Sequence, residues 1–179
     1  MLKVVIPASE QYNSAENLFY YSKETTLTLE HSLVSVAKWE AKWHKPFLSK
    51  EQKSYEETID YIRCMTITQN VDPLVYNSIP PDIVNKVDDY INEPMTATTF
   101  GMDTSSPNRE IITAEIIYYW MTELNIPMEC QKWHLNRLLT LVRVCSIKRS
   151  PGKKMSRRQT ANRYRELNQA RRKKYGTKG

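Results

Sequence analysis

Glycine is scarce in this chain of 179 residues, where it occurs only at positions 101, 152, 176 and 179. No two of these glycines have the spacing of a loop that wraps phosphate groups, so that class of nucleotide site is not predicted. Long apolar runs are also missing. The longest apolar run of interest, residues 116–121, is far shorter than the ~18–20 residues that a membrane-spanning helix needs. We therefore expect no membrane segment.

Cysteine is too sparse for a disulfide framework. Cys64, Cys130 and Cys145 are odd in number and widely spaced, which favours reduced thiols in a cytoplasmic protein. The apolar run at residues 1–7 is too short for a signal peptide. Motifs of serine hydrolases and metalloproteases are absent as well, so we do not expect an enzyme.

Acidic residues almost vanish from the end of the chain. Residues 148–179 hold 13 of the 26 Lys and Arg residues but only one of the 20 acidic residues, Glu166. Residues 1–147 therefore carry 13 basic and 19 acidic side chains, a division that the overall pI of 9.2 conceals. Such a block of like charge is typical of an interaction arm. We predict a body at residues 1–148 and a basic tail at residues 149–179.

The patterning of the body predicts a mainly α fold with a small N-terminal β element. Strands are expected at residues 2–6 and 25–30, with a loop or hairpin at residues 8–23. Helices follow. One is expected at residues 32–44 with Ser32 as its cap, one after a Ser54–Glu57 capping box, and one that starts at Asp72-Pro73. Further helices are expected at residues 82–91, 110–124 and 129–146. In the tail, Ser156 is expected to cap a marginal polar helix that ends near Lys174.

One pair of residues suggests metal or thiol chemistry. Cys130 and His134 are four residues apart on a predicted helix, so they would share a face. A zinc site needs two further ligands, and neither His31 nor His44 has a partner at a matching spacing. We predict no metal, no cofactor and no catalytic use of Cys130.

Tryptophans on amphipathic segments are candidate anchors for a protein partner. Aromatic and arginine side chains dominate binding hot spots, although the same residues also serve as core or boundary residues. The candidate partner-binding residues are Trp39, Trp43, Trp133, Arg137 and Leu138.

The basic tail is the other candidate interaction site. Its cations could contact nucleic-acid phosphates, or they could dock onto an acidic protein, including the body of this chain. No nucleic-acid reading motif accompanies them. The candidate residues are Lys153, Lys154, Arg157, Arg158, Arg163, Arg165, Arg171, Arg172, Lys173 and Lys174.

Several strings resemble the tail assembly chaperones of long-tailed bacteriophages. The strings are TLTLEHSLVSVAKWEAKWHKPFL (26–48), ETIDYIRCMT (57–66), MTAT (95–98), EIIYYWM (115–121), ECQKWHLNRLLTLVRVC (129–145), KKMSRR (153–158) and LNQARRKKYGTKG (167–179). The resemblance covers roughly residues 24–179, and residues 8–23 contribute nothing to it.

The resemblance implies a helical assembly factor in the host cytoplasm. Such a chaperone binds the tape measure protein, keeps it soluble, assists polymerisation of tail-tube subunits and is absent from the mature virion. Many members are also made in a longer, frameshifted form. Contact with the tail-tube protein and self-association are further expectations. A nucleic-acid-binding phage protein that acts through the basic tail is the alternative function.

Overall fold

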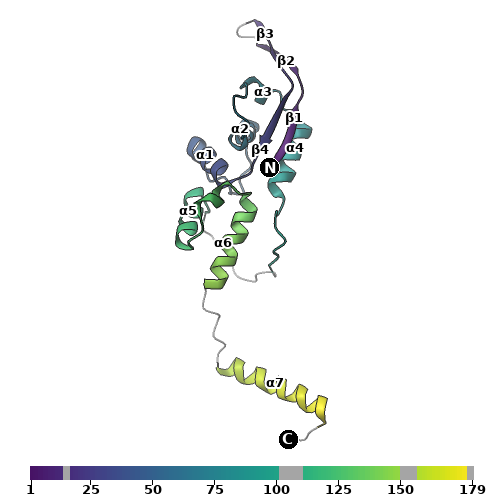
Figure 1. The fold of residues 1–179 in the computed structure, drawn as a ribbon, viewed down its shortest axis with the longest axis vertical. Coiled ribbons are helices and arrows are strands. Elements are labelled where there is room, and N and C mark those ends of the chain that lie inside the picture. The colour runs from purple at the N-terminus through teal and green to yellow at the C-terminus, as the bar shows by residue number, and fades with distance from the viewer. Residues whose placement is uncertain (14–16, 101–110, 150–156, 177–179) are drawn as a thin grey trace. The chain divides into compact units, whose positions relative to one another are not determined.

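The computed structural model describes residues 1–13, 17–100, 111–149 and 157–176. The chain divides into two compact units, Met1–Cys145 and Ser146–Gly179. The first unit contains the strands and most of the helices, and the second contains the end of α6 and the helix α7 (Figure 1). Helices predominate in the described residues, so the predicted mainly α fold with a small N-terminal β element is confirmed.

The first and last strands form one antiparallel pair. Strand β1 (Leu2–Ile6) lies beside β4 (Thr25–Leu29), with Leu2 opposite Leu29 and Ile6 opposite Thr25. Alternate side chains of both strands are buried, as expected for a sheet with one face on the core. These buried side chains are Val4, Ile6, Leu27 and Leu29. Both predicted strands are therefore present.

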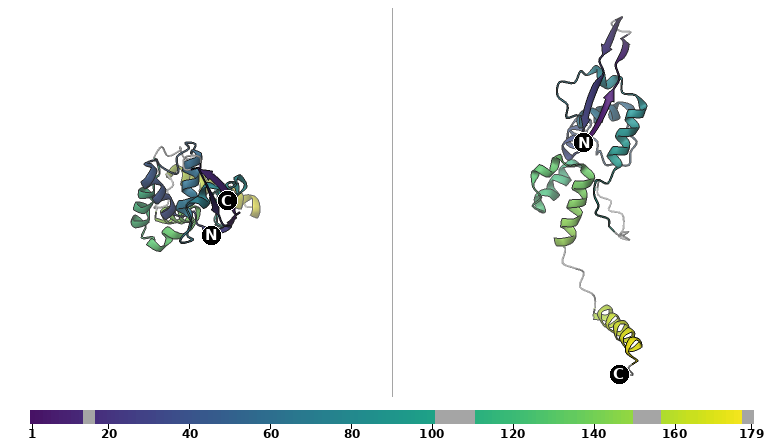
Figure 2. Two further views of the ribbon diagram at one scale, coloured as in Figure 1. Left: turned by 90° about the horizontal axis from the view of Figure 1, so that it is seen from above. Right: turned by 45° about the vertical axis from the view of Figure 1, so that its right-hand side comes forward.

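Between these strands the chain makes a hairpin. Strand β2 (Ser9–Asn13) pairs with β3 (Leu18–Ser22), and Ser9 is opposite Ser22. Figures 1 and 2 show this pair extending beyond most of the first unit, although β3 also contacts α3. The sequence predicts a loop or a hairpin at residues 8–23, and the chain forms the hairpin.

The first two helices begin where local signals predict. Helix α1 (Leu33–Trp43) is capped by Ser32, whose hydroxyl accepts a hydrogen bond from the Ser35 amide. It ends at His44, where φ is 54°, two residues before Pro46. Helix α2 (Tyr55–Met65) opens with the predicted capping box: Ser54 and Glu57 each accept a hydrogen bond from the other's amide.

The next three helices differ in length, from four residues in α3 to twelve in α4. Helix α3 (Leu74–Asn77) starts one residue later than the expected start at Asp72-Pro73, because Pro73 is its N-cap. The Asp72 carboxylate accepts a hydrogen bond from the Leu74 amide. Helix α4 (Pro81–Asn92) places proline in its first turn, where a missing amide hydrogen costs nothing. Helix α5 (Ala114–Glu123) lies within the predicted range of 110–124 but begins four residues after its start.

The predicted helix at residues 129–146 is wrong in one respect, because the structure divides it. A 3₁₀ helix, η1 (Met128–Lys132), is followed by the extended residue Trp133, and α6 (Leu135–Arg149) begins after His134. The break has a tertiary cause. His134 forms an isolated antiparallel bridge with Ser32, and the Leu135 amide donates to the carbonyl of His31 at 2.7 Å.

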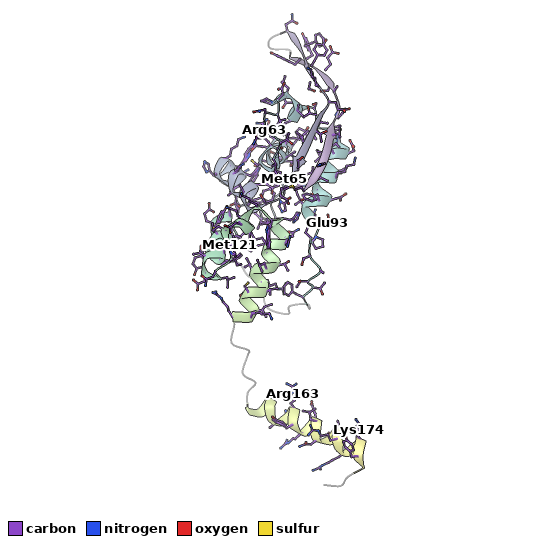
Figure 3. All side chains as sticks on the ribbon, in the orientation of Figure 1. Arg63, Met65, Glu93, Met121, Arg163 and Lys174 are labelled. Carbon is purple, nitrogen blue, oxygen red and sulfur yellow. The ribbon has the colours of Figure 1, made fainter. Side chains whose placement is uncertain are left out.

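The core forms where α1 packs against α2 and α5, and where α4 packs against β1. Met65 and Met121, labelled in Figure 3, are among its fully buried side chains. Buried polar groups support this apolar centre. The carboxylate of Glu40 accepts hydrogen bonds from the amides of Phe47 and Ala114, both at 2.7 Å, and so connects α1 to the start of α5.

The helix α7 (Arg157–Tyr175) belongs to the second unit. Every side chain from residue 161 to 176 is exposed. The predicted cap, Ser156, lies outside the described residues, although the predicted helix end near Lys174 agrees with the observed end at Tyr175. In the described parts of the chain, no helix is long and apolar enough to cross a membrane.

Candidate functional site

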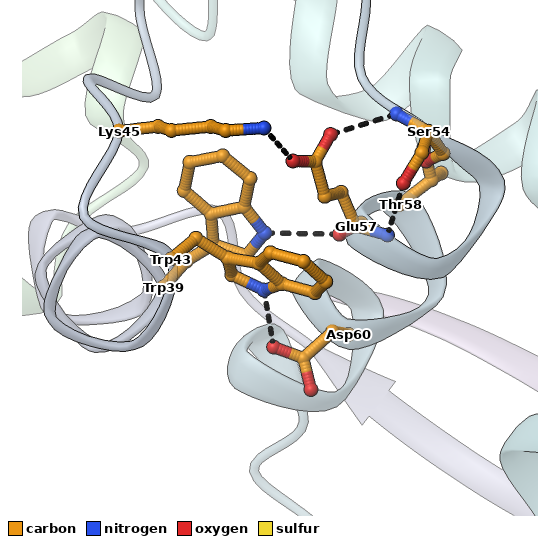
Figure 4. Close-up of polar contacts among 7 residues, drawn as sticks. All are labelled: Trp39, Trp43, Lys45, Ser54, Glu57, Thr58 and Asp60. Atoms are coloured by element: carbon orange, nitrogen blue, oxygen red, sulfur yellow. Dashed lines mark hydrogen bonds and ion pairs between the residues drawn. The ribbon is translucent and has the colours of Figure 1, made fainter.

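The two tryptophans of α1 lie together but in different environments (Figure 4). Their ring centroids are 6.2 Å apart and nearly stacked. Trp39 is only 1% exposed, and its indole N–H donates to the carbonyl of Glu57 at 2.9 Å. Trp43 is partly exposed, and its indole N–H donates to Asp60 Oδ2 at 2.9 Å. Trp39 is therefore a core residue, whereas Trp43 presents part of its ring at the surface.

Two buried carboxylates on α2, those of Glu57 and Asp60, hold the end of α1 in place against α2. Lys45 Nζ lies 2.6 Å from Glu57 Oε1, and Lys42 forms an ion pair with Asp60. The Lys45 hydrogen bond, with help from the Ser54 amide, lowers the pKa of Glu57. Burial raises the pKa of Asp60, but hydrogen bonds from Lys42 and Trp43 outweigh burial and lower it overall. Both groups are therefore charged at neutral pH and hold the α1 side chains against α2.

A shallow groove of about 330 Å³ opens beside Trp43, and we call it the aromatic groove. Its lining residues are Lys42, Trp43, Tyr55, Glu56, Ile59, Asp60, Arg63, Tyr76 and Asn77. Helices α1, α2 and α3 contribute these residues, so the groove exists only in the folded chain. Tyr55 is 65% exposed, whereas Ile59 and Tyr76 are buried. The groove therefore has an apolar, aromatic floor and a rim that carries both signs of charge.

A second hollow of about 440 Å³ lies between α2 and α4. Phe47, Tyr61 and Ile62 contribute apolar surface to it. The ammonium of Lys53 lies 4.4 Å from the centroid of the Phe47 ring, and burial lowers the pKa of Lys53. Among the residues described around this hollow, no histidine, cysteine or serine accompanies the amine. Thr58 and Asp88 add a hydroxyl and a carboxylate to its lining.

The second predicted cluster lies at the start of α6. The guanidinium carbon of Arg137 is 4.2 Å from the centroid of the Trp133 ring. Trp133 is partly buried against the core, and Leu138 is completely buried. Leu138 is thus a core residue, while Trp133 and Arg137 present a stacked cation–π pair.

The Cys130 and His134 pair does not share a helical face, because the break at Trp133 separates η1 from α6. Burial raises the pKa of the Cys130 thiol. His134 Nε2 lies 3.0 Å from the carbonyl oxygen of Tyr90. Where the chain is described, no group of three or more His, Cys, Asp or Glu residues is arranged to hold a metal ion.

His134 instead belongs to a buried polar cluster with His31. The two imidazole centroids are 5.1 Å apart, and His31 Nδ1 lies 2.5 Å from the Tyr61 hydroxyl. Burial, with the charge of His134, lowers the pKa of His31 to about 3. The cluster holds the β4–α1 junction against the start of α6, which is a structural role.

The candidate residues of the basic tail lie mainly on α7. Lys153 and Lys154 lie outside the described residues, and Arg157 and Arg158 lie on the first turn of α7. The remaining candidates are exposed: Arg163, Arg165, Arg171, Arg172, Lys173 and Lys174. Arg163 and Lys174 are labelled in Figure 3.

Sequence reasoning missed two aromatic groups. Tyr55 and Tyr76 of the aromatic groove come from α2 and α3, and no sequence spacing connects them. The other group lies on the β2–β3 hairpin, where the ring centroids of Tyr12 and Phe19 are 4.9 Å apart. Both rings are exposed, as is that of Tyr21. The run Leu18–Tyr21 was the available signal, because three aromatic residues in succession are typical of a strand.

Comparison of this chain with protein-family models, with curated proteins and with solved structures found no match.

Proposed function

We propose that this protein is a tail assembly chaperone of a long-tailed bacteriophage. It binds the tape measure protein in the host cytoplasm, keeps it soluble and assists polymerisation of the tail tube around it. It acts by binding and not by catalysis. The strings of residues 26–48 and 129–145 support this assignment through their resemblance to the family. The resemblance also implies that the protein is absent from the mature virion.

The aromatic groove is the main structural support for this function. A tape measure protein is a long helical rod, and before the tube encloses it, its apolar helix faces are open to water. An amphipathic helix binds a partner by inserting apolar side chains, one or two turns apart, into a hydrophobic groove. The floor of Trp43, Tyr55 and Ile59 offers such a surface, and the rim charges of Lys42 and Glu56 would contact polar residues beside it.

The groove is also held ready for a partner. Hydrogen bonds and ion pairs from Lys42 and Trp43 to Asp60 fix one wall. Arg63 lies over the ring of Tyr76, with its guanidinium carbon 4.9 Å from the ring centroid, and so supports the other wall. A surface that is ordered before binding loses less conformational entropy when the partner docks.

Co-expression tests this function. Full-length protein produced together with the tape measure protein of the same phage is expected to increase the soluble fraction of that partner. Tyr55→Ala removes an exposed ring from the groove without opening the core, so we expect it to reduce this effect strongly. Loss of a central aromatic anchor typically weakens binding by about 2 kcal/mol, or roughly thirtyfold.

Tyr119→Ala is the matched control, because Tyr119 on α5 is 63% exposed and lies outside the groove. We expect it to support solubility as the unmodified chain does. Thermal unfolding of both variants checks that the body remains folded. Equal loss or equal retention of the effect in the two variants would show that the aromatic groove is not the binding site.

A further inference from the structure

The helix α7 is strongly basic, and its described side chains lie outside the core. It carries eight Lys and Arg residues and a single acid, Glu166, over 19 residues. All its side chains from residue 161 onward are exposed. At 1.5 Å per residue such a helix is about 28 Å long. It is therefore an extended cation whose interaction surface differs from the aromatic groove.

The cations surround the helix. Successive residues of an α-helix are rotated by about 100°, and this places the six exposed cations around the whole circumference with no gap wider than about 100°. These cations are Arg163, Arg165, Arg171, Arg172, Lys173 and Lys174. A flat acidic surface would need positive charge on one side only. Charge on all sides suits a ligand that encloses the helix.

A membrane surface fits this distribution poorly. An interfacial helix needs one broad apolar face opposite its charges. The apolar and aromatic residues of α7 are few, and helical geometry spreads Tyr164, Leu167 and Ala170 over roughly a third of the circumference with arginine and lysine among them. The helix therefore lacks the segregated face that would enter the lipid.

The major groove of double-stranded DNA fits all these features. It is about 12 Å wide, and an α-helix with side chains is about 10–12 Å across. Phosphates line both walls, so a helix in the groove meets negative charge on several sides. We propose that α7 binds duplex DNA by lying in the major groove, where its arginines and lysines contact phosphates of both strands without reading a particular sequence. Arginine suits this role because its planar guanidinium binds phosphate through two parallel hydrogen bonds.

This binding goes beyond the chaperone function and does not depend on it. A salt series on the full-length protein tests it, with a fluorescently labelled duplex of mixed sequence as the probe. The logarithm of the binding constant falls with the logarithm of salt concentration by about 0.9 for each phosphate neutralised. Contact by most of the six exposed cations of α7 predicts a slope of about −4 to −5. The double variant Arg165→Gln/Arg172→Gln should reduce the magnitude of that slope by about 2.

Two variants of Ala170 distinguish binding of the intact helix in the groove from binding by charge alone. Ala170→Pro keeps every charge but interrupts α7, because proline lacks an amide hydrogen and clashes with the preceding turn. Ala170→Gln keeps both the charge and the helix. We expect the proline variant to bind duplex DNA about tenfold or more weakly, and the glutamine variant to bind like the unmodified chain. Circular dichroism and the melting temperature confirm that the body of each variant is folded.

Three further ligands test the choice of duplex DNA: single-stranded DNA, duplex RNA of the same sequence, and vesicles that contain phosphatidylserine. The major groove of A-form RNA is deep and narrow, so duplex RNA should bind more weakly than duplex DNA. Equal or tighter binding of any of the three would overturn the proposal, as would equal affinities of the proline and glutamine variants. Tyr55→Ala should leave DNA binding unchanged, which keeps this test separate from that of the chaperone function.

Discussion

At the scale of single residues, two tryptophans one turn apart show how neighbours decide a side chain's role. Trp39 faces α2 and is buried, with its N–H satisfied by a backbone carbonyl. Trp43 lies at the edge of the same interface and shares Asp60 with Lys42. The sequence predicts the same role for both, because they lie on one helix. The spacing of the two tryptophans does not show where α2 runs or where its carboxylates lie.

His31 makes stability depend on pH. Its pKa is about 3 in the folded chain and about 6.5 when unfolded, because burial opposes the charged form. Between these values the unfolded state binds more protons, so the free energy of unfolding falls as pH decreases from 6.5 towards 3. The loss is at most about 1.4 kcal/mol per pH unit for this group. Urea denaturation at several pH values measures it.

The variants His31→Gln and His44→Gln isolate this effect. His44 is exposed at the end of α1 and is the matched control. The pH dependence below 6.5 should become shallower in His31→Gln and stay unchanged in His44→Gln. If His31→Gln kept the full dependence of the unfolding free energy on pH, protonation of His31 would not be its cause.

At the scale of elements, the ends of helices are set by two kinds of signal. Ser32 and the Ser54–Glu57 pair cap their helices through contacts within three residues, so their positions could be predicted from the sequence. The break before α6 could not, because it depends on pairing between His134 and Ser32. A periodic apolar pattern continues through Trp133, and only the folded neighbour interrupts the helix.

Glu40 provides a test of how elements are held together. Its two carboxylate oxygens accept from amides in the segment after α1 and at the start of α5, 74 residues further along the chain. Glu40→Gln replaces one acceptor by a donor that faces a buried N–H group. We expect a loss of about 2–3 kcal/mol in the free energy of unfolding, measured with urea. Glu115→Gln, an exposed acid on α5, should change it by less than about 0.5 kcal/mol.

At the scale of the whole molecule, the chain combines an acidic unit and a basic unit. The charge division was visible in the sequence, because composition alone shows it. The aromatic groove was not visible, since Trp43, Tyr55 and Tyr76 come from three helices that only folding brings together. The mainly α fold could be predicted from periodicity and caps, whereas the arrangement of its surfaces required tertiary contacts.

Removal of residues 150–179 should leave the body intact. These residues belong to the second compact unit, and the described side chains of α7 are exposed. A chain that ends at Arg149 should therefore unfold in urea with a free energy within about 0.5 kcal/mol of the full chain. It should also keep its effect on the tape measure protein and lose DNA binding. A loss of more than about 1.5 kcal/mol would show that the tail contributes to the stability of the body.

The hydrogen bond from the Leu135 amide to the His31 carbonyl has a consequence for how the protein folds. It closes a loop of more than a hundred residues, and such closures raise the contact order of a fold and slow its formation. A growing polypeptide cannot complete its core until α6 has been made, since two partners of His31, His134 and Leu135, come more than a hundred residues later. Until then the core lacks the buried side chains of Leu135 and Leu138, and the apolar groups that they cover stay open to water. The chaperone proposed here is thus itself vulnerable to aggregation during its own synthesis.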